Sequence, residues 1–288
     1  MEGRVIAAHG RQYLVELPDG IVLPCFTRGK RSDVACGDRV SIMRSSDDQG
    51  VIEAIQPRTS LLYRSNEVKQ KLIAANVDQL LIVVATEPAF SDDLITRALI
   101  AAESEEIEPL IVLNKCDLTD KLAAARERLK LFSNIGYRVV ELSALEHAED
   151  LRPELFGVTS VLVGQSGMGK STLVNALAPE AKAATREISV ALDSGKHTTT
   201  HATLYHLAPE SHLIDSPGLQ EFGLGHLDRQ EIEQAFPEFR PYLGQCRFRD
   251  CHHNKEPDCA LIAAVHSGKI DKKRFDAYHR IIGNQRDN

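Results

Sequence analysis

The sequence predicts a multidomain α/β protein with three parts. These are a small N-terminal β-barrel, a central, mostly parallel sheet with helices on both faces, and a C-terminal helical region around a metal site. Three observations predict this: short apolar runs separated by turns fill the first 57 residues, longer apolar runs then alternate with helical patterns, and three of six cysteines fall between positions 246 and 259. The 288 residues suit two or three domains of roughly 100 to 200 residues. We expect domains at residues 1–60, 61–225 and 226–288.

Composition and charge exclude several classes of protein. Hydrophobic residues make up 43% and charged residues 26%, which is typical of a soluble globular chain and excludes disorder. The net charge of -7 argues against coating nucleic acid by bulk charge, although the acidic excess lies in residues 58–239, with 27 acidic and 17 basic side chains. The longest apolar run, Leu80–Ala85, is far shorter than the roughly 20 residues of a membrane span, and no secretory signal begins the chain. We expect a cytoplasmic protein without a membrane partner.

The N-terminal runs alternate apolar and polar residues and are separated by turn signals such as Pro18-Asp19-Gly20. Five short strands within about 55 residues predict a small barrel. The predicted strands are 3–8, 12–17, 21–26, 39–44 and 50–55. The basic loop Arg28–Arg31 between the third and fourth strands is either a solvated turn or a phosphate contact.

From residue 76 the pattern predicts a covered parallel sheet. Leu80–Val84 is apolar at every position, as expected for a strand buried on both faces. Further strands are predicted at 79–85, 110–113, 138–142, 160–163, 202–207 and 212–214, and helices at 92–103, 122–135 and 170–177.

A glycine-rich phosphate-binding motif follows one of these strands. Gly164–Ser171 reads GQSGMGKS, which matches G-x-x-x-x-G-K-[ST], and it lies between the strand 160–163 and a helical pattern. The alternative is a glycine-rich turn that contains a lysine by chance. The strand before the motif and the helical pattern after it argue against this alternative. The backbone of such a loop cradles phosphates, Lys170 reaches the β- and γ-phosphates, and the Ser171 hydroxyl binds Mg²⁺. The predicted phosphate-site residues are Gly164, Gln165, Ser166, Gly167, Met168, Gly169, Lys170, Ser171 and Thr172.

A second motif predicts the base. Asn114, Lys115, Cys116 and Asp117 read N-K-x-D directly after the strand 110–113. The Asp117 carboxylate can accept hydrogen bonds from the ring N–H and exocyclic amine of guanine, whereas adenine would leave it unpaired. Ser143-Ala144 after the strand 138–142 adds a short supporting turn. The ligands predicted are therefore GTP and GDP with Mg²⁺.

The remaining nucleotide motif comes last. Asp215-Ser216-Pro217-Gly218 has the D-x-x-G form, with Asp215 near Mg²⁺ and the Gly218 N–H near the γ-phosphate. Thr199 is the expected switch residue, although Thr198 and Thr200 are equally placed. Along this chain the motifs follow the order N-K-x-D, S-A, phosphate-binding loop, D-x-x-G. In a regular GTPase the phosphate-binding loop and D-x-x-G come before N-K-x-D and S-A. The changed order predicts a circularly permuted domain.

The C-terminal cysteines have the spacing of a metal site. Cys246, Cys251 and Cys259, with His252 or His253, supply three thiolates and an imidazole, the ligand set of a closed structural Zn²⁺ site. Three unrelated core cysteines are the alternative. Helices are predicted at 258–266 and 271–282. The second carries Lys272–Arg274, either as a solvated face or as a nucleic-acid contact.

Taken together, these motifs resemble the RsgA/YjeQ family of bacterial GTPases. The resemblance covers nearly the whole chain and includes Gly37–Val40, Asn76–Gln79 and Glu256–Ala260. It implies an OB-fold barrel, binding of the 30S ribosomal subunit and its 16S rRNA during late maturation, and GTP hydrolysis that 30S stimulates and that leads to release. It also implies that Cys251 and His253 form the family's Cys-x-His pair.

The resemblance also assigns the orientation of the attacking water to His197, which would act together with Lys170 of the phosphate-binding motif. Leu219 occupies the position after D-x-x-G where many GTPases hold a water-orienting Gln, and an apolar side chain cannot orient water. His197 is preferred over Gln220. Because Gly167 stands where potassium-dependent GTPases offer an Asn, potassium dependence is not predicted. We expect the protein to hydrolyse GTP and thus to be a phosphoric anhydride hydrolase. We also expect it to be a monomer.

Two other functions are compatible with parts of the sequence. The protein could be a zinc-stabilised RNA-binding module with nucleotide as a structural ligand, which would bind naked RNA without turnover. It could instead be a P-loop ATPase or small-molecule kinase, against which Asp117 argues.

Overall fold

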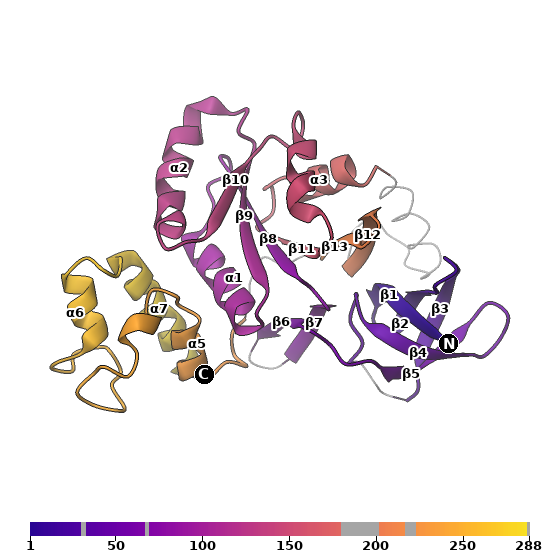
Figure 1. Ribbon diagram of the computed structural model, residues 1–288, viewed down its shortest axis with the longest axis horizontal. Helices are drawn as coiled ribbons and strands as arrows, with labels where there is room; N and C mark the ends of the chain where they lie inside the picture. Colours follow the sequence, from indigo (N-terminus) through magenta and orange to yellow (C-terminus); the bar gives the residue numbers. More distant parts are fainter. Residues whose placement is uncertain (30–32, 67–68, 180–201, 217–222, 287–288) are drawn as a thin grey trace.

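The computed structural model describes residues 1–29, 33–66, 69–179, 202–216 and 223–286. The N-terminal part is a five-stranded barrel (Figure 1) of β1 (Glu2–His9), β2 (Gln12–Glu16), β3 (Val22–Thr27), β4 (Arg39–Arg44) and β5 (Gly50–Ile55). The strand order is β1-β2-β3-β5-β4, and pairing of β1 with β4 closes it. Val5, Tyr13 and Ile52 are examples of the alternate residues that are buried inside the barrel. The apolar positions of the period-two pattern therefore form its core. The predicted barrel is confirmed.

A hairpin that the sequence analysis did not predict joins the barrel to the central domain. It consists of β6 (Leu61–Asn66) and β7 (Lys69–Ala75). Asn76 follows it and donates from Nδ2 to the Gly37 carbonyl over 3.0 Å. Gly37 has φ 92°, and a Cβ there would lie 2.2 Å from the Ala75 carbonyl oxygen. Two of the resemblance motifs, around Gly37 and Asn76, therefore meet at this junction.

The central sheet has the strand order β10-β9-β8-β11-β13-β12. All neighbours are parallel except β12 and β13, and every residue of β8 is buried. Helices lie against this sheet (Figure 1). The strands are β8 (Gln79–Ala85), β9 (Glu108–Asn114), β10 (Arg138–Glu141), β11 (Thr159–Val163), β12 (Ala202–Ala208) and β13 (Ser211–Asp215); the helices are α1 (Asp92–Ser104), α2 (Thr119–Ser133), η1 (Ala148–Leu155) and α3 (Lys170–Leu177). The predicted α/β domain is confirmed.

Barrel and central sheet are one continuous sheet of eleven strands. β1 pairs antiparallel with β12, with Ala7 opposite Thr203. Side chains add to this junction: Arg4 Nη2 donates to Thr159 Oγ1 over 3.0 Å, and Glu16 Oε2 lies 2.9 Å from His206 Nε2. The barrel is therefore fixed to the edge of the central sheet.

The C-terminal part contains α5 (Arg229–Gln234), η2 (Arg240–Tyr242), α6 (Ala260–His266) and α7 (Lys272–Arg286). Its core includes the stacked rings of Phe236 and Phe239, with Tyr278 edge-on to both. This packing continues into the central core without a break. None of the helices in the described residues is both long and apolar enough to cross a membrane.

The basic run Lys272–Arg274 on α7 is only partly exposed, because one of its three residues is buried. Arg274 is fully buried and pairs with Glu238 over 2.6 Å, while Lys272 pairs with Asp276 over 2.6 Å on its own helix. Arg280 pairs with Asp93 of α1 over 2.6 Å. The interpretation of Lys272–Arg274 as an exposed basic stretch was therefore wrong for Arg274, whose charge is neutralised inside the protein.

Candidate nucleotide and metal sites

The phosphate loop runs from the end of β11 to the start of α3. Its glycines are required by geometry: Gly164 has φ 146° and Gly169 has φ 89°. A Cβ at position 164 would lie 2.2 Å from the Val83 carbonyl oxygen, and one at 169 would lie 2.3 Å from Asn114 Nδ2. α3 begins at Lys170, so Ser171 and Thr172 stand in its first turn. This arrangement directs backbone N–H groups and a helix N-terminus toward one point, as anion binding requires.

Lys170 connects the phosphate loop electrostatically to β13. Its Nζ donates to the carbonyl oxygens of Gly164 and Gln165 over 2.6 and 2.7 Å. Burial lowers the pKa of Lys170, and the nearby Asp215 carboxylate opposes this effect. Burial likewise raises the pKa of Asp215, against the influence of Lys170. The two motifs that should face the γ-phosphate and Mg²⁺ thus lie close enough to influence each other.

Asn114 holds three loops together. Its side chain is buried at the end of β9, and Nδ2 donates to the Met168 carbonyl over 2.9 Å. Its Oδ1 accepts from the backbone N–H groups of Lys115 and Ala144, both over 2.8 Å. One amide therefore connects the base motif, the Ser143-Ala144 turn and the phosphate loop.

The other base-site residues are arranged around this amide. Lys115 has φ 62° and donates from Nζ to the Glu87 carbonyl over 2.8 Å, and the Cys116 N–H donates to the Leu142 carbonyl over 3.1 Å. Asp117 follows, and its carbonyl accepts from the Thr119 N–H over 3.0 Å. The Ser143 hydroxyl is buried without a partner among the described residues, so the site offers an unsatisfied polar group beside the base motif. The base motif and the Ser143-Ala144 turn therefore lie beside each other, as the predicted base site requires.

One supporting contact had no signal in the sequence. Gln165 Oε1 accepts the backbone N–H of Ser91 over 2.9 Å, joining the phosphate loop to the N-cap of α1. The two residues are 74 positions apart, and neither the loop motif nor the cap pattern specifies the other. Three expected site residues, His197, Thr199 and Gly218, lie outside the described residues.

The candidate metal centre lies in the C-terminal part of the chain. The ligand atoms of Cys246, Cys251, His253 and Cys259 all lie within 4.8 Å of one another. His253 Nδ1 is 3.3 Å from Cys259 Sγ and 3.6 Å from Cys246 Sγ. Three thiols and one imidazole at these separations match the donor set of a structural zinc site and could hold one Zn²⁺.

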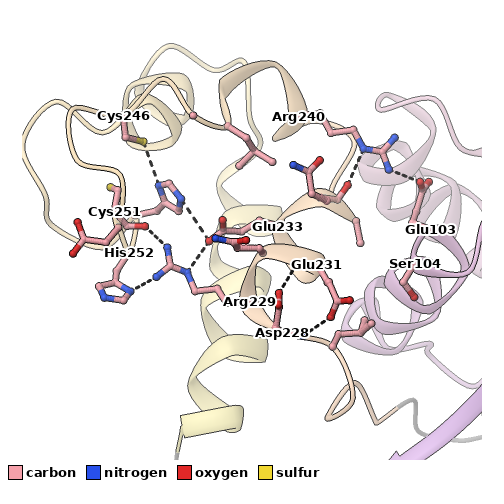
Figure 2. Close-up of a pocket in the computed structure, with 18 of the residues that line it drawn as sticks. Glu103, Ser104, Asp228, Arg229, Glu231, Glu233, Arg240, Cys246, Cys251 and His252 are labelled. Carbon is pink, nitrogen blue, oxygen red and sulfur yellow. Dashed lines mark hydrogen bonds and ion pairs between the residues drawn. The ribbon is translucent and has the colours of Figure 1, made fainter.

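Surrounding residues favour His253 over His252 as the fourth ligand (Figure 2). His253 Nε2 lies 3.5 Å from Glu233 Oε1, which also accepts from the Tyr278 hydroxyl over 2.6 Å, whereas the His252 ring contacts Arg229. Burial would raise the pKa of Glu233, but its bonds with His253, Tyr278 and Arg229 outweigh this and lower it to about 2. A carboxylate on the far nitrogen orients a metal-binding imidazole and fixes its tautomer.

The chain is similar to known proteins over nearly its whole length. Residues 55–225 match the family described as RsgA GTPase. The protein named small ribosomal subunit biogenesis GTPase RsgA from Burkholderia pseudomallei is 57% identical over 286 residues, covering 98% of this chain and 91% of that protein. The protein of the same name from Bordetella pertussis is 56% identical over 285 residues, covering 98% and 95%.

Two solved structures share the whole fold. YjeQ from Thermotoga maritima superposes with a TM-score of 0.74 at 31% identity and covers 99% of this chain and 98% of its own. YloQ, described as a circularly permuted GTPase, gives 0.72 at 29% identity, with 99% and 95% covered. The predicted permutation agrees with the description of YloQ. The chain belongs to the RsgA GTPase family, and it is a GTP hydrolase.

Proposed function

We propose that this GTPase binds the 30S ribosomal subunit, assists its late maturation, and is released after 30S-stimulated hydrolysis of GTP. The observation that carries this proposal is the likeness over 98% of the chain to relatives named small ribosomal subunit biogenesis GTPase. The barrel, the nucleotide domain and the zinc-binding part are all present, so the likeness is not confined to the nucleotide motifs. The ribosomal contacts proposed are with 16S rRNA, made by a monomer in the cytoplasm.

Catalysis would depend on positioning and electrostatics. Lys170 moves from the loop carbonyls to the β- and γ-phosphate oxygens, where its charge and the loop N–H groups stabilise the negative charge that develops during transfer. Ser171 and Asp215 would hold Mg²⁺, directly and through water, and that ion neutralises phosphate charge when bound. His197 would orient the attacking water. Asn114 holds the base-binding loops and the phosphate loop in fixed positions relative to one another.

Hydrolysis rates with and without purified 30S subunits test the proposal. We expect slow hydrolysis by the free protein and a rate increase of at least about tenfold with 30S, because a partner completes the catalytic geometry. Equal rates with 30S, 50S and no ribosome would contradict the triggering mechanism. Co-sedimentation with 30S, 50S and 70S should give binding to 30S with a non-hydrolysable GTP analogue and weaker binding with GDP.

His197→Ala tests the assigned catalytic residue. The stimulated rate should fall by about 10²- to 10⁴-fold, the range of a lost proton-handling or water-positioning group, while GTP affinity stays nearly unchanged. His266→Ala, at the end of α6, is the control and should hydrolyse GTP at the wild-type rate. A fully active His197→Ala protein would remove His197 from the mechanism. Tight binding of naked RNA without turnover would instead favour the RNA-binding alternative.

A further inference from the structure

α1 contacts both the phosphate loop and the C-terminal part of the chain that carries the metal cluster. At its N-terminal end, the Ser91 N–H donates to Gln165 Oε1 of the phosphate loop. Along its length it contacts the zinc-binding part, defined here as residues 223–286 (Figure 1). A helix of 13 residues is about 20 Å long, and its backbone hydrogen bonds let α1 move as one rigid element.

The contacts to the zinc-binding part follow one face of α1. Asp93, Thr96 and Glu103 are three and seven positions apart, which places them on one stripe of a helix. Asp93 pairs with Arg280 over 2.6 Å, and the buried Thr96 Oγ1 accepts from Arg274 Nη1 over 3.0 Å.

Near the other end of α1, Glu103 pairs with Arg240 over 2.6 Å (Figure 2). This bond lies beside an interdomain cleft of about 1300 Å³ that also borders Cys246 and Cys251. Three cations from η2 and α7 thus attach the zinc-binding part to α1 from end to end.

The buried contact makes this attachment specific. Arg274 is 0% exposed, and it packs against the ring of Phe236 at 4.5 Å while it bonds both Glu238 and Thr96. A buried guanidinium tolerates little displacement, because a shift would break its bonds to Glu238 and Thr96 where no water replaces them. α1 and the zinc-binding part are therefore expected to move together.

We propose that α1 transmits the state of the phosphate site to the zinc-binding part, with Gln165 as the positioning residue on the phosphate side and Arg274 and Arg280 on the zinc-binding side. Phosphate binding draws the loop N–H groups and Lys170 toward the ligand. Because the Gln165 side chain holds the start of α1, a change in the loop shifts α1 and the zinc-binding part with it. This connection is additional to the covalent path from Asp215 into residue 223 and beyond.

Hydrogen exchange of the full-length, zinc-loaded protein tests the proposal without any ribosome. Exchange of residues 226–286 is measured without nucleotide, with Mg²⁺ and GDP, and with Mg²⁺ and a non-hydrolysable GTP analogue, each saturating. In the wild type we expect exchange in α5 and α7 to change about fivefold or more between states, the size of a typical coupling between sites.

Three variants and one control separate the path from general destabilisation. Gln165→Met, Thr96→Val and Arg280→Ala should each reduce the nucleotide-dependent difference to below about twofold. Lys272→Ala is the matched control, because it also removes one cation from α7 but its partner Asp276 is on the same helix, and it should keep the full difference. Arg280 is half exposed, so Arg280→Ala should fold even if Thr96→Val does not.

A wild-type protein with no nucleotide-dependent exchange in residues 226–286 would overturn the proposal. So would an Arg280→Ala protein that keeps the full difference. Because no ribosomal subunit is present, either result would leave the proposed 30S function standing, and a failure of 30S stimulation would leave this coupling untouched.

Discussion

Asn114 shows how much one side chain determines at the nucleotide site. Its amide uses one donor and one acceptor to join three loops that are far apart in the chain. The sequence predicts this residue as part of the base motif. Its bond to the Met168 carbonyl lies within the phosphate loop, so Asn114 also supports the part of the site that holds phosphate.

Replacing Asn114 with Ala should weaken both GTP and GDP binding by about 10- to 100-fold, because the buried Met168 carbonyl and Ala144 N–H lose their partner. Titration calorimetry with GDP measures this. Asn134→Ala, at the exposed end of α2, is the control and should bind GDP normally. Unchanged affinity in Asn114→Ala would show that the loops keep their positions without the amide.

At the scale of elements, the metal loop is the clearest case of structure that depends on a ligand. Within the described residues 244–258 there is no helix or strand, and α6 begins at Ala260 with Cys259 at its N-cap position and no side-chain cap. Such a segment gains little from its own hydrophobic core. Its stability is expected to come from the metal.

Cys259→Ser should therefore reduce bound zinc from one ion per chain to about a tenth or less, and increase amide exchange in residues 246–266. Metal analysis of the purified protein gives the first value. Cys116→Ser, which changes a thiol of the base motif far from the cluster, should keep one zinc. Equal zinc content in both variants would contradict the assigned ligand set.

The junction of β12 and β13 with the barrel should be sensitive to pH. Burial, Arg4 and His206 lower the pKa of His212 to about 4 from an ordinary value of 6.5. The unfolded chain then binds the proton more tightly than the folded one, so this contribution to stability is complete above about pH 6.5 and is lost as the pH falls toward 4.

The expected result is a melting temperature that falls more steeply between pH 6.5 and 5 in the wild type than in His212→Gln. Scanning calorimetry at several pH values provides the measurement. His9→Gln, at the end of β1, serves as the control and should follow the wild-type curve. Identical pH profiles in all three proteins would exclude His212 as the source.

At the scale of the whole molecule, the buried Arg274 pairs with Glu238 inside the zinc-binding part and donates to Thr96 of α1, so one guanidinium joins two domains. Arg274→Ala should lower the free energy of unfolding by about 3–5 kcal/mol, because Glu238 would be left buried and unpaired. The double variant Arg274→Met with Glu238→Leu should recover most of this loss. Urea titration of the zinc-loaded protein tests both.

Arg126→Ala is the surface control for that experiment. It breaks the pair with Glu141, whose side chains are 53% and 34% exposed, and should cost less than about 1 kcal/mol. A double variant as unstable as Arg274→Ala would show that the loss comes from packing and not from an unpaired charge.

How far the sequence predicts this molecule depends on the range of the interactions. The barrel strands and the phosphate loop follow from local patterns: alternation in β1–β5, and glycines whose backbone angles no other residue adopts easily. The hairpin β6–β7 has no such pattern, since Cys36 and Gly37 of the barrel help to position it. The burial of Arg274 could not be predicted, because arginines are rarely buried. It depends on bonds to Glu238 and Thr96, which are distant in the sequence.

The pairing of β1 with β12 also has a consequence for solubility. Without the barrel, β12 would be the outer strand of the central sheet, and its free backbone groups could pair with another chain. The barrel thus shields an edge that would otherwise promote aggregation. A protein shortened to residue 59 onward should form oligomers through this edge, even though its nucleotide motifs are complete.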